Sequence, residues 1–100
     1  MTTLQEAFPP DVQRFTEQQG LQRYLTLAVD LINQYFPDAR AIQADYVEDP
    51  EGDGAWISLT AAVEGAPSEI MERDDRLSAQ WLAQVPWPDV FKIRHQYRAA

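Results

Sequence analysis

Residues 42–63, IQADYVEDPEGDGAWISLTAAV, decide the fold of this chain. Apolar and polar side chains alternate on both sides of a turn rich in Asp, Pro and Gly, a pattern typical of a β-hairpin. We expect strands near Ala41–Glu48 and Ala55–Glu64, joined by an acidic turn at Asp49–Gly54. One face of the second strand should pack on helices, because its side chains are all apolar: Ile57, Leu59, Ala61 and Val63.

Helical spacing of apolar residues is found on both sides of this hairpin. A capping-box pattern at Thr16–Gln19 predicts a long helix that starts there and ends before Pro37. A short helical segment precedes it and is interrupted at Pro9 and Pro10. After the hairpin we expect a second long helix over Ser68–Gln84. Its narrow buried stripe comprises Ile70, Leu77, Trp81 and Val85.

The end of the chain, Val90–Arg98, alternates strictly and predicts a half-buried strand. Its inward side chains are Phe91, Ile93, His95 and Tyr97, and its outward ones are Lys92, Arg94, Gln96 and Arg98. The expected fold is a single α+β domain over residues 1–100, in the order α-β-β-α-β. Its three-stranded antiparallel sheet is packed on one face by the two long helices. Which hairpin strand pairs with the last strand stays open.

Composition restricts the class of protein. With 100 residues, 45% of them hydrophobic, the chain fits one domain with a single core. It has no Cys and therefore no disulfide or thiolate metal site. We expect a cytoplasmic protein without membrane contact, because neither a signal peptide nor a membrane-length apolar run is recognisable. A net charge of −8 disfavours nucleic acid and suits either solubility or a basic partner.

Catalytic groupings are not recognisable. The sequence has no Gly-rich phosphate loop and no pattern that pairs a nucleophile with a base. His95 is the one histidine, and a lone histidine on the apolar side of a strand is more typical of a core residue than of a ligand. We therefore predict no catalytic residues, no cofactor and a function other than catalysis.

The acidic turn resembles the start of a calcium loop, since Asp49, Glu51 and Asp53 alternate before Gly54. Thr60 stands where such a loop needs a closing Glu, so an ordinary hairpin turn is the favoured interpretation. A domain that binds a cation or small molecule through this turn is the alternative function.

An outward surface is the better candidate for a function. Trp56 should lie on the outer face of the sheet with Asp45, Arg94 and Arg98, and Trp and Arg are enriched at binding hot spots. The alternative is a solvent-exposed face on which an arginine covers Trp56. Trp87, between two prolines, either plugs the edge of the core or is a docking aromatic.

Several motifs resemble a family of small uncharacterised prokaryotic proteins. They are Asp49-Pro50-Glu51, Trp56 at a strand start, Trp81, Pro86-Trp87-Pro88 and Ile93-Arg94-x-x-Tyr97. The resemblance implies a bacterial, cytosolic, stand-alone domain. The function we expect is a protein-interaction or regulatory module, such as a small acidic adaptor or inhibitor. Its partner would be another protein, and a homodimer is a further expectation because the sheet has two edges.

Overall fold

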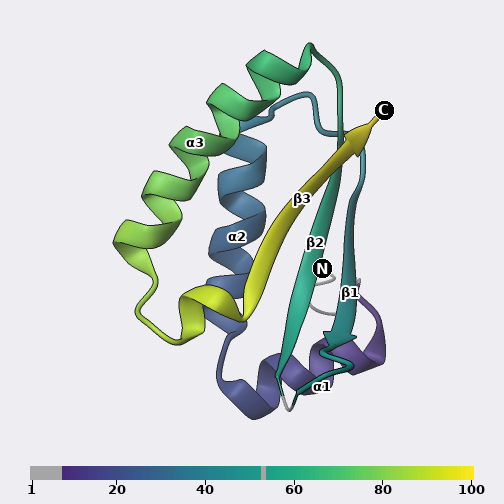
Figure 1. Cartoon of the computed structure of the whole chain (residues 1–100), viewed down its shortest axis with the longest axis vertical. Coiled ribbons are helices and arrows are strands. Elements are labelled where there is room, and N and C mark those ends of the chain that lie inside the picture. Colours follow the sequence, from purple (N-terminus) through teal and green to yellow (C-terminus); the bar gives the residue numbers. More distant parts are fainter. Residues whose placement is uncertain (1–7, 53) are drawn as a thin grey trace, which may run out of the picture.

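The computed structural model describes residues 8–52 and 54–100. They form an α+β fold of three helices and a three-stranded sheet, which confirms the predicted class (Figure 1). The elements are α1 (Pro10–Gln19), α2 (Gln22–Tyr35), β1 (Ile42–Glu48), β2 (Ala55–Val63), α3 (Pro67–Gln84), a 3₁₀ turn (Asp89–Phe91) and β3 (Ile93–Ala99). Among the described residues no helix combines the length and the apolarity that a membrane crossing requires.

The sheet has the order β1-β2-β3 and is mixed. β1 and β2 form the predicted antiparallel hairpin, with Asp45 opposite Ser58. β3 pairs with β2 in parallel, with Ser58 opposite Arg94, so the prediction of an all-antiparallel sheet was wrong. β3 is parallel to β2 because α3 runs back along the sheet and returns the chain to the end at which β2 began.

The first two helices meet at Gly20. Its φ of 65° is left-handed, and its N–H donates to the carbonyl of Glu17, which ends α1. The predicted capping box was therefore wrong: Thr16 lies inside α1, where its hydroxyl donates to the Val12 carbonyl at 2.7 Å. The second long helix, expected over Ser68–Gln84, starts one residue earlier, at Pro67 after Ala66.

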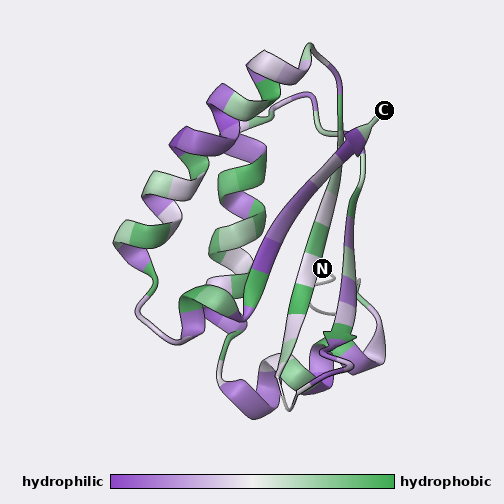
Figure 2. Ribbon diagram, in the orientation of Figure 1, coloured by the Kyte–Doolittle hydropathy of each residue, from purple (hydrophilic) through white to green (hydrophobic). Residues whose placement is uncertain are grey.

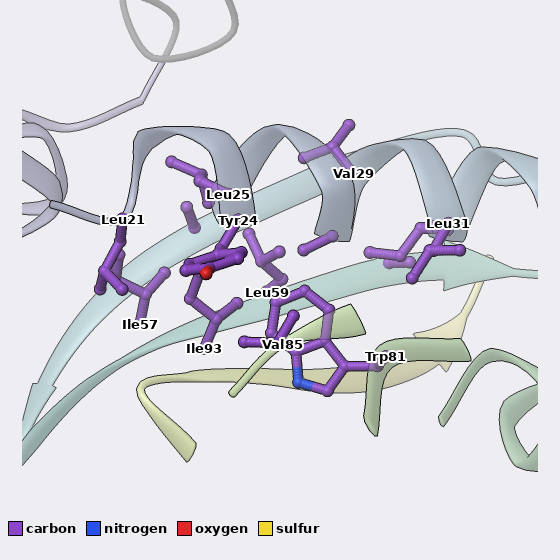
Figure 3. Close-up of a cluster of buried hydrophobic side chains, with 14 of the residues drawn as sticks. Leu21, Tyr24, Leu25, Val29, Leu31, Ile57, Leu59, Trp81, Val85 and Ile93 are labelled. Carbon is purple, nitrogen blue, oxygen red and sulfur yellow. The ribbon is translucent and has the colours of Figure 1, made fainter. Parts of the chain in front are cut away.

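The core lies between the sheet and the helices. The apolar face predicted for β2 is buried, as Figure 3 illustrates for Ile57 and Leu59 below the side chains of α2. Trp81 and Val85 complete this layer from the side of α3. β3 adds Ile93, and in Figure 2 the rest of that strand is mainly hydrophilic.

The last strand is shorter than the alternation predicted. Residues 89–91 form a 3₁₀ turn, so β3 begins at Ile93. Ile93, His95 and Tyr97 face inward, as expected, with Ile93 buried and the other two half-buried. Phe91 is outside the strand and 56% exposed, so its predicted inward position was wrong.

Candidate functional site

Two hollows lie along the seam where α3 runs beside β3. The first, here called the His95 hollow, has a volume of about 240 Å³. It is lined by Asp74, Ser78, Trp81, Leu82, Val90, Phe91, Ile93, Arg94 and His95. The second, the Met71 hollow, has a volume of about 420 Å³. It is lined by Val63, Gly65, Pro67, Ile70, Met71, Tyr97, Arg98 and Ala99.

Trp81 fixes the deep wall of the His95 hollow. Its indole N–H donates to the Val90 carbonyl at 3.0 Å, which ties α3 to the segment leading into β3. The ring meets His95 edge-on, with centroids 5.2 Å apart and planes at 83°. Buried on the predicted helical stripe, Trp81 thus sets the distance between helix and strand at this end of the seam.

His95 enters the same hollow from the inward face of β3. Its Nε2 atom is buried and has no hydrogen-bond partner among the described residues. Burial lowers the pKa of His95, while the charge of Asp74 and a hydrogen bond to the backbone of Ala28 act in the opposite direction. The imidazole is therefore neutral near pH 7.

Tyr97 separates the two hollows. Its hydroxyl donates to Asp74 Oδ1 at 2.6 Å, which joins the middle of α3 to the last part of β3. Burial raises the pKa of Tyr97, and the Asp74 carboxylate that accepts its hydrogen bond adds to this shift. The hydroxyl keeps its proton, so this bridge is present throughout the neutral range.

Exposed apolar side chains gather beside these hollows. The large hydrophobic residues that are exposed within the described part of the chain are Met71 (67%), Leu82 (63%), Trp87 (77%) and Phe91 (56%). Leu82 and Phe91 line the His95 hollow, and Met71 lines the Met71 hollow. Exposed apolar surface that borders a hollow, as Leu82 and Phe91 do, is typical of interaction sites.

The sequence analysis missed this seam, although a signal for it existed. Met71 and Leu82 are eleven residues apart on α3, about three turns, and so share a face. That face is distinct from the buried stripe that contains Leu77 and Trp81. The available indication was that α3 carries apolar residues outside the stripe that the core buries.

The residues predicted for an interaction surface are brought together in part. The guanidinium carbon of Arg94 lies 3.9 Å from the centroid of the half-buried Trp56 ring, a cation–π geometry. Asp45 and Arg94 flank Ser58 across the sheet, and Arg98 is further along β3. Trp87 is off the sheet, on the connector after α3, and is 77% exposed.

The acidic turn is held by its own first residue. Asp49 Oδ1 accepts the N–H of Glu51 at 2.9 Å, and the Asp49 N–H donates to the Gly54 carbonyl at 2.9 Å. Asp53, the third proposed cation ligand, lies outside the described residues. Within residues 8–52 and 54–100, no group of three or more His, Cys, Asp or Glu side chains is placed to hold a metal ion.

Comparison with known proteins gives no relative, because no family model, curated protein or solved structure matches this chain.

Proposed function

We propose that this chain is a non-enzymatic protein-interaction or regulatory module that binds another protein along the seam between α3 and β3. The observation that carries the proposal is the position of Met71, Leu82 and Phe91, which are exposed and border the two hollows. Exposed apolar groups beside preformed hollows favour a partner that buries them.

The outer face of the sheet supports the same class of function to a smaller degree. Arg94 belongs to both surfaces, because it lines the His95 hollow and also covers Trp56. A partner on the seam would thus contact the edge of the aromatic–arginine pair. Trp and Arg side chains in such positions are enriched among residues that dominate binding energies.

Affinity capture from a lysate of the source cells tests the proposal. Leu82→Glu places a charge in the apolar border, while Leu82 is exposed enough for the fold to tolerate the change. Ala79→Glu is the matched control on an exposed position of α3 outside both hollows. A partner retained by the wild type and by Ala79→Glu but lost with Leu82→Glu supports the seam.

Trp56→Ala tests the outer face separately in the same experiment. If the partner is lost with Trp56→Ala and kept with Leu82→Glu, the interaction surface is the outer face of the sheet. If all three variants recover the same proteins as the wild type, neither surface binds them and the proposed function is wrong.

A further inference from the structure

We propose that the seam binds an extended, acidic segment of its partner, which adds to β3 as a fourth strand. Strand addition to an open sheet edge is a common mode of peptide recognition, in which backbone hydrogen bonds give affinity and alternate side chains give specificity. The inference rests on the proposed function and names the class of partner.

The backbone of β3 offers the required hydrogen-bonding groups. The Ile57 N–H donates to the Lys92 carbonyl at 2.8 Å, and the Ala100 N–H donates to the Val63 carbonyl at 3.0 Å. In a parallel pair, alternate residues point their backbone groups at the same neighbour. The even-numbered residues of β3 therefore bond to β2, and the half-buried His95 and Tyr97 point theirs toward the free edge. Ile93 points the same way but is buried. Among the described residues, β3 is an edge strand of the sheet.

The two hollows match the spacing of side chains on an added strand. Arg94 is central to the β3 segment that lines the His95 hollow, and Arg98 is central to the segment at the Met71 hollow. Four residues of strand separate them, about 13 Å at the usual rise per residue. Inward side chains four positions apart would enter the two hollows, and the one between them would lie near the Tyr97–Asp74 bridge. That middle side chain should be small.

The charges on the two faces of β3 determine which other residues the bound segment should carry. β3 carries two of the eight Lys and Arg residues of the chain, Arg94 and Arg98, both on the outer face. Lys92 lies just before the strand and is paired with Asp89 at 3.2 Å. Neighbouring side chains of paired strands interact most favourably when their charges are opposite. The outward residues of the bound segment should therefore be Glu or Asp. Its inward residues should be apolar, because Asp74 lines the His95 hollow.

A second copy of this chain suits the edge less well. Antiparallel pairing of two β3 strands about Gln96 would place Arg94 of one copy beside Arg98 of the other. Like charges directly opposite one another destabilise a strand pair. The occupant we infer is accordingly a segment of another protein and not the same edge of a second molecule.

Defined peptides test this inference. The probes are acetylated and amidated seven-residue peptides of the pattern T-Φ-E-A-E-Φ-T, in which Φ is Leu, Val, Phe or Met in four separate peptides. Each is titrated to 1 mM into the ¹⁵N-labelled full chain, and amide shifts and hydrogen exchange are followed by NMR. We expect saturable shifts in β3 and in the facing turns of α3. The amides of His95 and Tyr97 should exchange at least tenfold more slowly with peptide bound, because carbonyl groups of the added strand accept their hydrogen bonds.

Two controls define the mechanism. Replacing both Glu of the peptide by Lys should weaken binding at least tenfold at low salt, and the difference should shrink as salt screens the charges. Leu82→Glu and Met71→Glu in the chain should weaken binding of the acidic peptides, whereas Ala79→Glu should not.

The inference is overturned if none of the four peptides shifts β3, if the Lys and Glu versions bind equally, or if the free chain self-associates in sedimentation with His95 and Tyr97 already protected. Loss of a native partner with Leu82→Glu together with silent peptides would keep the interaction function and reject strand addition. Peptide binding without any native partner dependent on Leu82 would reject the proposed function instead.

Discussion

At the scale of single residues, three side chains hold α3 against β3. Trp81 bonds to the Val90 carbonyl, His95 packs edge-on against Trp81, and Tyr97 donates to Asp74. Each comes from an inward position of its element, and each also lines a hollow. The residues that stabilise the seam are thus the same ones that line its hollows.

Tyr97→Phe removes the hydroxyl from the 2.6 Å bond to Asp74 and keeps the ring, which lies 4.6 Å from that of Phe36. We expect the free energy of unfolding to fall by about 1.5–3 kcal/mol, the usual contribution of a hydrogen bond to a charged group. Urea denaturation measures it. Tyr35→Phe, at a half-buried tyrosine whose hydroxyl bonds to no described residue, should change stability by less; equal effects would contradict the structural role of the bridge.

Because His95 is desolvated in the folded chain, the free energy of unfolding should depend on pH. Its folded pKa is lowered by burial, so the unfolded chain, with a histidine pKa of about 6.5, binds the proton more readily. The stabilisation from neutral His95 is complete above about pH 6.5 and is lost as the pH falls below this value.

His95→Gln isolates this effect from the many carboxylates of the chain. The stability difference between the wild type and this variant, from urea denaturation at pH 7.5 and 5.5, should shift against the wild type at the lower pH. A difference that is constant, or that favours the wild type more at pH 5.5, would show that the imidazole is not desolvated as the structure indicates.

At the scale of elements, the sequence predicted what alternation and helical spacing encode. Three features were predicted correctly, because periodicity reports which side of an element is buried. They are the hairpin, the inward face of β2 and the stripe containing Leu77 and Trp81. Periodicity does not report the direction of a strand. The parallel course of β3 depends on how α3 crosses the sheet, which no local pattern in residues 90–98 encodes.

Element boundaries were predicted less well for a related reason. Thr16 fits a capping box in sequence, yet the helix continues through it because Gly20 can adopt the left-handed conformation that ends α1.

The exposure of Trp87 was left open by the sequence, since a tryptophan between prolines fits a core plug as well as a docking group. Composition alone does not decide between these positions.

Gly20→Ala should destabilise the chain by about 1 kcal/mol. A Cβ at this position would meet nothing within 4 Å, so the cost comes from the backbone, whose φ of 65° a β-carbon disfavours. Gly20→Asn is the matched control, because Asn adopts left-handed backbone angles more readily than Ala. Thermal unfolding of both variants checks the prediction, which fails if Gly20→Asn costs as much as Gly20→Ala.

At the scale of the whole molecule, the sheet is small and one of its edges adjoins a helix. β2 is central and buried, while β3 at the edge carries basic side chains outward and aromatic ones inward. The net charge of −8 leaves this basic row as a local exception on an acidic molecule. Shape and charge together thus distinguish the α3–β3 seam from the remaining surface, and the proposed binding of an acidic strand follows from both.

Residue-resolved amide hydrogen exchange of the free chain measures whether the edge of β3 is open. The amides of Arg94, Gln96 and Arg98, which point to β2, should exchange slowly, and those of His95 and Tyr97, which point to the free edge, should exchange at least tenfold faster. Uniform protection along β3, or protection of the odd-numbered residues alone, would show that this edge of the sheet is not open.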